Sequence, residues 1–115
     1  MSQNQKRRCS ACDENAPKAT EMSLLEFQKD HPQWQIVFED GIDKLRRKFT
    51  FNRYTDAIDF TDEIAALADF EDHHPAILLE WGSVTVTWWT HKIGGLHNND
   101  LVMAQLTDSV FEIEQ

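Results

Sequence analysis

The spacing of apolar residues changes twice along this chain, and this change constrains its fold most strongly. Between Trp34 and Phe51, apolar residues recur at about every second position, which is the period of a half-buried β-strand. Between Thr55 and Ala68 they recur at every third or fourth position, which is the period of an amphipathic α-helix. The two-residue alternation returns between Val84 and His91. This order of periods predicts helices that alternate with pairs of strands.

The first half of the chain is predicted to be a helix followed by a hairpin. The helix begins near Thr20, where Ser23 and Glu26 fit a capping box, and it ends at Pro32. Two strands on either side of a turn at residues 40–43 then form the hairpin.

The second half repeats this plan and adds a last helix. Thr55 is the expected cap of the second helix, which ends around residues 72–74 because Pro75 disfavours helical geometry in the residue before it. The remaining elements follow in order: a strand over 76–81, a turn at Gly82-Ser83, a strand over 84–91 and a helix capped by Asn98 or Asn99.

The predicted fold class is α+β: a four-stranded antiparallel sheet with three helices packed on one face, in the order α-β-β-α-β-β-α. Residues 1–19 have no apolar period and are expected to form a flexible N-terminal tail, whereas residues 20–115 form one domain. The strand face that carries Trp89 and His91 is neither cleanly polar nor cleanly apolar. Such a face is typical of a functional site or a subunit contact.

The formal net charge of -9 argues against generic binding to nucleic acid or to anionic membranes, because both of these partners are also negative. No window approaches the roughly 18 uninterrupted apolar residues of a membrane span. The basic N-terminus is not followed by the apolar stretch of a secretory signal, so we expect a cytoplasmic protein. One basic island is interpreted as a solvated strand face rather than a docking patch: Lys44, Arg46, Arg47, Lys48 and Arg53.

The two cysteines of the chain, Cys9 and Cys12, form a single CxxC motif in the N-terminal tail. One such pair is too few for a four-cysteine zinc site, and no βα unit surrounds it as in a thioredoxin-like centre. An incidental tail motif and a redox or metal role both stay open.

Three of the five histidines lie close together in the sequence: His73, His74 and His91. Histidine has an unperturbed pKa of about 6.5 and can give and take protons near neutral pH. His73 and His74 end a helix, where the helix dipole favours a protonated imidazole. Asp100 lies in the first turn of the last helix, where the helix dipole favours an acid, and a functional role for it also stays open. The alternative that these groups merely cap or stabilise helix ends stays open.

Zinc is a second reading of the same residues. Adjacent His73 and His74 tend to direct their rings apart, and the recognised two-histidine metal spacings are wider, so we expect proton transfer and no metal. Trp34 fits either a core position or an aromatic wall for a planar ligand. The other two histidines carry no independent signal and are interpreted as surface or loop residues: His31 and His97.

Taken together, these residues resemble the signature of the pterin-4a-carbinolamine dehydratases. The matching positions are His73-His74-Pro75, Trp81, Val84-x-Val86, Thr90-His91, Gly95-Leu96 and Asp100. The family's central hairpin and helix are similar to Leu45-x-Arg47-x-Phe49-x-Phe51 and Ala57-x-x-Phe60, and the opening of many bacterial members is similar to Cys9-x-Ala11-Cys12 with Ala16-Pro17. The chain departs at Trp81-Gly82, where many members carry a tyrosine and an asparagine.

This resemblance implies a hydro-lyase that converts 4a-hydroxytetrahydrobiopterin (pterin-4a-carbinolamine) to quinonoid dihydropterin and water. Histidines act as general acid and base without a cofactor, and the reaction recycles the pterin cofactor of aromatic amino acid hydroxylases. The residues expected to be catalytic are His73, His74 and His91. Those expected to bind or support the substrate are Asp100, Trp34, Pro75 and Thr90.

The resemblance also implies partners. Family members form dimers or tetramers, so we expect a homo-oligomer, and phenylalanine hydroxylase is the expected functional partner. Certain animal members also bind a homeodomain transcription factor, which gives a binding module as the rival function. The natural pterin and the assignment of acid and base among the histidines do not follow from the sequence.

Overall fold

The computed structural model describes residues 17–114 of the chain. The N-terminal tail up to residue 16, with Cys9 and Cys12, lies outside these residues. The elements are α2 (Glu21–Asp30), β1 (Gln35–Glu39), β2 (Ile42–Thr50), α3 (Tyr54–Glu71), β3 (Ala76–Glu80), β4 (Ser83–Trp88), the 3₁₀ turn η1 (His91–Ile93) and α4 (Asn98–Glu114). The predicted α+β class and order of elements are confirmed.

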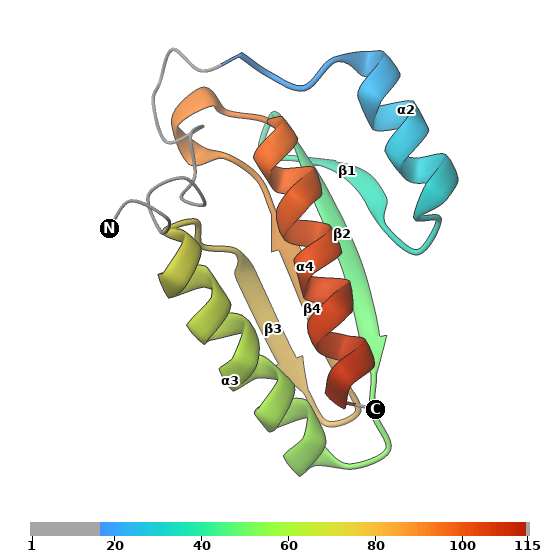
Figure 1. Ribbon diagram of the computed structural model, residues 1–115, viewed down its shortest axis with the longest axis vertical. Helices are drawn as coiled ribbons and strands as arrows, with labels where there is room; N and C mark the ends of the chain where they lie inside the picture. Colours follow the sequence, from blue (N-terminus) through green and yellow to red (C-terminus); the bar gives the residue numbers. More distant parts are fainter. Residues whose placement is uncertain (1–16, 115) are drawn as a thin grey trace.

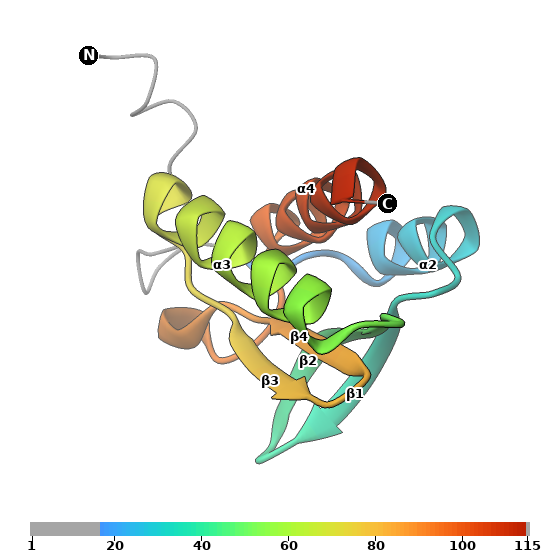
Figure 2. The ribbon, with the colours of Figure 1, turned by 90° about the horizontal axis from the view of Figure 1, so that it is seen from below.

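The four strands form one antiparallel sheet in the order β1-β2-β4-β3. Figure 1 shows α4 running across the middle of the sheet and α3 beside it along β3. Turned by 90°, the molecule has all three helices on one side, and the opposite face of the sheet is open (Figure 2). The structure is therefore two layers with a single core between them.

The core consists of the apolar faces that the two periods predicted. Alternate residues of β4 are fully buried on its helix-facing side: Val84, Val86 and Trp88. Residues of α3 at spacings of three and four are buried against them: Ala57, Phe60, Ile64 and Ala68. Because β4 and α3 each present one continuous apolar face, these two faces pack against each other.

Both hairpins have two-residue turns. Asp40 and Gly41 have φ values of 55° and 76°, as in the turns whose twist matches paired strands. Glu80 pairs with Ser83, so Trp81 and Gly82 form the second turn. The predicted turns at 40–43 and 82–83 were therefore too long and one residue late, respectively.

Two predicted helix caps were wrong. The side chain of Thr20, not of Ser23, caps α2: its Oγ1 accepts the Ser23 N–H at 3.1 Å. Helix α3 begins at Tyr54, so Thr55 lies inside it, and Arg53 precedes it without a side-chain cap. The C-terminus of α3 is as predicted, with Asp72 in the left-handed region at φ 56°.

Arg47 interrupts the apolar face of β2 because it joins the sheet to α4. Its Nη1 lies 2.7 Å from Asp108 Oδ1, and its guanidinium lies over the ring of Phe49. The same carboxylate accepts the indole N–H of Trp34 at 3.0 Å. Burial raises the pKa of Asp108 above its usual value, and the bonds from Trp34 and Arg47 oppose this rise.

We expect Asp108→Ala to lower the free energy of unfolding by about 2–4 kcal/mol, because the indole N–H of Trp34 and the guanidinium of Arg47 lose their partner. Asp108→Asn should cost less than half of this, since the raised pKa means that the charged carboxyl is the less favourable form in the folded state. For the same reason, the stability of the wild-type protein relative to the asparagine variant should fall as the pH rises above 3.8, the ordinary pKa of an aspartate.

Urea unfolding at several pH values measures both effects. Asp62→Ala, on the exposed side of α3, is the matched control and should change stability by less than about 0.5 kcal/mol. An asparagine variant as unstable as the alanine variant at pH 7 would show that the charge, and not the acceptor, is what stabilises this contact.

Candidate active site

The register of the second hairpin brings the two histidine-bearing segments together. Ala76 pairs with Thr87 in the β3–β4 ladder. Continued beyond the strands, this antiparallel register sets His73 opposite Thr90 and Asp72 opposite His91. The end of α3 and the segment after β4 therefore meet at one edge of the sheet.

A cavity of about 330 Å³ lies where these segments meet. Its lining residues are Asp72, His73, His74, Thr90, His91 and Lys92. The structure thus brings the three predicted histidines and Thr90 to one place. Pro75 is half-buried at the point where the chain enters β3, and it is not a lining residue. Trp34 is fully buried and bonded to Asp108, away from this lining.

Asp100 is the buried centre of the site. Its carboxylate is fully buried, and Oδ1 lies 2.6 Å from Nε2 of His73. Oδ2 accepts the hydroxyl of Thr90 at 2.7 Å and the backbone N–H of His97 at 2.9 Å. One carboxylate therefore joins the end of α3, the segment after β4 and the start of α4.

His97 has a structural role that the sequence analysis missed. Its ring Nδ1 accepts the backbone N–H of Asn99 at 3.0 Å, while the backbone N–H of His97 donates to Asp100 Oδ2. This is a reciprocal cap of α4 in which an imidazole nitrogen replaces the usual hydroxyl or amide oxygen. The expected capping residues, Asn98 and Asn99, lie inside the helix. A polar residue three positions before Asp100 was the available signal.

His73 and His74 bind carboxylates through their side chains. His73 is 4% exposed, and its ring stacks on that of Trp88 with 5.5 Å between centroids and 11° between planes. His74 is exposed, and its Nε2 lies 3.0 Å from Asp69 Oδ1. The last carbonyls of α3 are instead bonded by backbone N–H groups, including that of His73 to Ala68. Within the described residues, no three His, Cys, Asp or Glu side chains are grouped as metal ligands.

His91 is not on the strand that was predicted to carry it. Strand β4 ends at Trp88, and His91 begins η1 inside a small loop closed by backbone bonds between Thr90 and Gly95. The side chain of His91 is exposed, and its ring centroid lies 4.6 Å from that of Trp89. Gly94, at φ 62°, provides the left-handed conformation that turns the loop back.

The N-terminal end of the described chain also holds this loop. The backbone N–H of Ala19 donates to the carbonyl of Leu96 at 2.7 Å. The aliphatic part of the Lys18 side chain packs where a Cβ on Gly95 would stand, so a larger residue at position 95 would displace it. Residues 18 and 19, predicted as part of the tail, thus contact the loop that carries His91.

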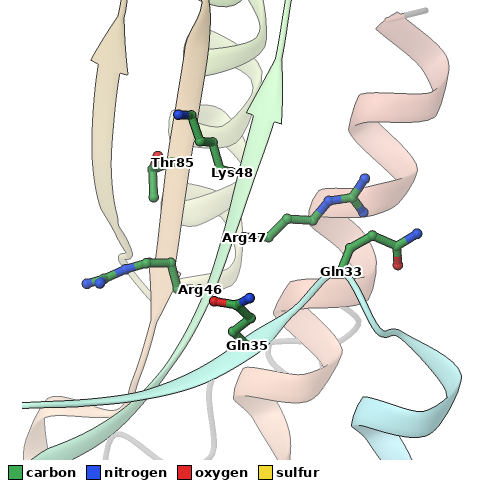
Figure 3. Close-up of a pocket in the computed structure, with 6 residues that line it drawn as sticks. All are labelled: Gln33, Gln35, Arg46, Arg47, Lys48 and Thr85. Atoms are coloured by element: carbon green, nitrogen blue, oxygen red, sulfur yellow. The ribbon is translucent and has the colours of Figure 1, made fainter.

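A second cavity, of about 500 Å³, lies beside β2 and includes part of the basic island (Figure 3). Arg46 and Arg47 extend in opposite directions from β2 in this view. Arg46 forms a two-bond ion pair with Glu39 at 2.9 and 2.7 Å, which lowers the pKa of that carboxyl, and Arg47 pairs with Asp108. These pairings argue against an anion site. The predicted solvated strand face is wrong for Lys44, which is buried, and for Arg47, which contacts α4 on the covered side of the sheet.

Known proteins are similar to this chain in sequence and in fold. Residues 17–110 match the family described as pterin 4 alpha carbinolamine dehydratase. The chain belongs to this family. The resemblance found in the sequence and the expectation of a hydro-lyase are thereby confirmed at the level of the pterin-4a-carbinolamine dehydratase family.

Individual relatives cover almost the whole chain. A protein of Marinobacter nauticus with the provisional name pterin-4-alpha-carbinolamine dehydratase is 50% identical over 96% of this chain and all of its own. A protein of the same provisional name from Syntrophotalea carbinolica is 48% identical over 90% of this chain and 93% of its own. A crystal structure of a transcriptional coactivator/pterin dehydratase from Brucella melitensis superposes with a TM-score of 0.74 at 30% identity, covering 82% of this chain and 98% of that one.

The helices of the described residues can be compared with the requirements for a membrane span. In residues 17–114, no helix has both the length and the apolar character needed to cross a bilayer. The cytoplasmic location expected from the sequence stays a prediction.

We expect Asp100→Ala to destabilise the protein by about 3 kcal/mol or more, because three donors, two of them buried, lose their common acceptor. Asn98→Ala, at an exposed position in the same helical turn, is the matched control and should change stability by less than about 0.5 kcal/mol. Urea unfolding measures both. A loss below about 1 kcal/mol for Asp100→Ala would mean that this carboxylate does not hold the three segments together.

Proposed function

We propose that this protein dehydrates pterin-4a-carbinolamine to quinonoid dihydropterin and water by histidine general acid and base catalysis. The observation that carries the proposal is the convergence of His73, His74 and His91 on one cavity, in a chain of this family. The cavity of about 330 Å³ is at the lower end of the range of small-molecule sites.

The reaction requires two proton movements. A proton must reach the hydroxyl that leaves carbon 4a, and another must leave ring nitrogen 5. A positioned acid and a positioned base each contribute about 10²–10⁴-fold to such a step. The histidines reach the cavity from two separate segments, with His73 and His74 on one and His91 on the other. This arrangement suits one proton donor and one proton acceptor around a flat heterocycle.

Asp100 gives His73 a defined state. A carboxylate can only accept hydrogen bonds, so with Asp100 ionised the Nε2 of His73, 2.6 Å away, carries a proton. Nδ1 is then the nitrogen of His73 that exchanges a proton with the substrate. The bonds from Thr90 and His97 to the other carboxylate oxygen keep this pair in place.

In this proposal, His73 and His91 exchange the acid and base roles, and His74 orients the pterin and shares the proton transfer. The exposure of His74 and His91 allows direct contact with a ligand. Thr90 supports the site through Asp100. Pro75 supports it by directing the chain from α3 into β3.

The cellular role follows from the chemistry of the product. Quinonoid dihydropterin is the oxidised form from which the pterin cofactor of aromatic amino acid hydroxylases is regenerated, and phenylalanine hydroxylase is the proposed functional partner. We also propose a homo-oligomer, a dimer or a tetramer. The edge strand β3 and its turn expose Leu78 (56%) and Trp81 (78%), which supports a subunit contact at this edge.

A binding module is the second candidate function, because the name of the Brucella melitensis neighbour includes a transcriptional coactivator. Catalysis and binding can coexist in one protein, so capture of a partner does not decide between them. Turnover does decide, since a protein that only binds leaves the carbinolamine to dehydrate at its spontaneous rate.

We expect the wild-type protein to accelerate the dehydration of a synthetic pterin carbinolamine, followed by the absorbance of quinonoid dihydropterin. His91→Ala and His73→Gln should each lower kcat by about 10²–10⁴-fold. Glutamine at position 73 retains an N–H donor for Asp100, so loss of activity there reports on proton transfer rather than on folding.

His31→Ala is the matched control. This histidine ends α2 and stacks on Phe27 outside the cavity, so its replacement should leave kcat unchanged. Circular dichroism and thermal melting confirm that each variant is folded. Full activity in the His73→Gln, His91→Ala double variant would rule out this mechanism.

A further inference from the structure

Two consecutive tryptophans, Trp88 at the end of β4 and Trp89 directly after it, each contact a different histidine of the site. Neighbouring residues of a strand point to opposite faces of the sheet. The ring of Trp88 is therefore in the core, where it stacks on His73. Trp89 follows the last residue of β4. Continuing the β2–β4 register sets it beside Lys44, on the face opposite to Leu45 and Trp88, and its ring contacts His91. We propose that Trp88 and Trp89 are positioning residues that fix the two imidazoles from opposite faces of the sheet. This inference rests on the proposed function and extends it.

Trp88 is itself fixed in the core. It is fully buried, and its indole N–H donates to Thr107 Oγ1 at 3.0 Å. The hydroxyl of Thr107 in turn donates to the carbonyl of Met103 at 2.7 Å. Trp88 thus presents a rigid, nearly parallel surface to the ring of His73. The bond from His73 Nε2 to Asp100 defines one direction of the imidazole, and the stack defines its plane.

Trp89 is fixed from the sheet. Nζ of Lys44 lies 4.3 Å from the centre of a Trp89 ring, a cation–π contact, and Lys44 is itself 7% exposed. Glu39 and Asp40, at 3.6 and 3.3 Å, hold the Lys44 ammonium in place. Successive contacts therefore link the first hairpin to Lys44, Lys44 to Trp89, and Trp89 to the imidazole of His91. His91 itself is on a short exposed loop.

This arrangement explains how an exposed histidine can have a defined orientation. A side chain on a 3₁₀ turn is free to change rotamer unless a neighbour restricts it. Displacement of a proton-transfer group by about 1 Å can cost 10²-fold in rate. The half-buried ring of Trp89 provides this restriction through a ring contact, which occupies neither nitrogen of His91.

The test compares four tryptophan variants by steady-state dehydration kinetics. Trp89→Ala should lower kcat by about tenfold or more with little change in KM, because the chemical step loses a positioned group. Trp89→Phe keeps an aromatic ring and should recover most of the loss. Trp88→Leu should lower kcat similarly, and Trp88→Phe should retain more activity than the leucine variant. Tyr54→Ala, 47% exposed at the start of α3 and at the opposite end of that helix from His73, is the matched control and should keep the wild-type kcat.

An NMR measurement on the unliganded protein separates this inference from the proposed function. The ring current of Trp89 shifts the ring-proton resonances of His91, and Trp89→Ala should remove this shift while the resonances of His31 stay unchanged. Unmoved His91 resonances together with wild-type kcat in Trp89→Ala would overturn the inference for Trp89. A folded Trp88→Phe variant that loses as much activity as Trp88→Leu would overturn it for Trp88.

Failure of the proposed dehydration can be distinguished from failure of the positioning role. A wild-type protein without turnover above the spontaneous rate would refute the proposed dehydration, while the NMR shift would still report whether Trp89 fixes His91. Active wild-type protein with unaffected tryptophan variants would instead refute the positioning role alone.

Discussion

The fully buried carboxylate of Asp100 is the interaction on which the site depends. A charged group in such a position is tolerated only when it is fully hydrogen-bonded, and here it accepts bonds from three segments of the chain. The same three bonds cap α4 and join it to the end of α3 and to the segment after β4. A change at this residue is therefore expected to affect stability and, in the proposed mechanism, the state of His73 as well.

The two faces of the sheet contribute differently to the site. The helix-covered face provides the rigid part, with His73 against Trp88 and Asp100. The open face provides the accessible part, with His91 against Trp89. One imidazole is thus nearly enclosed and the other is in contact with solvent. In the proposed elimination of water, a ligand in the cavity would meet one nearly enclosed and one exposed imidazole.

Most of the fold could be predicted from the sequence, because the two apolar periods are physical consequences of helix and strand geometry. Where elements end was less predictable. The strand predicted to reach His91 stops at Trp88. After Trp88 the chain leaves the ladder and forms a loop, which is closed by a bridge between Thr90 and Gly95. The cap of α4 by His97 depends on a ring nitrogen whose role only the folded neighbourhood defines.

The candidate site could be predicted only in part, because sequence spacing shows which residues can meet but not what surrounds each of them. The close spacing of His73, His74 and His91 suggested convergence, and the hairpin register provides it. Alternation alone could not tell whether Trp34 belongs to the core or to a ligand pocket, since both environments favour an aromatic ring; the structure places it in the core. Phe38 shares its alternation yet is 74% exposed, because it lies on an edge strand.

The short turn at Trp81–Gly82 has a consequence far from where it lies. It is at the opposite end of the β3–β4 hairpin from the histidines, yet its length sets which residues face each other along the ladder. A slip of two residues would carry Thr90 and His91 about 7 Å past His73, and a slip of one would invert the faces of the two tryptophans. Insertions in this surface turn would therefore shift the two histidine-bearing segments against each other without touching any residue of the cavity.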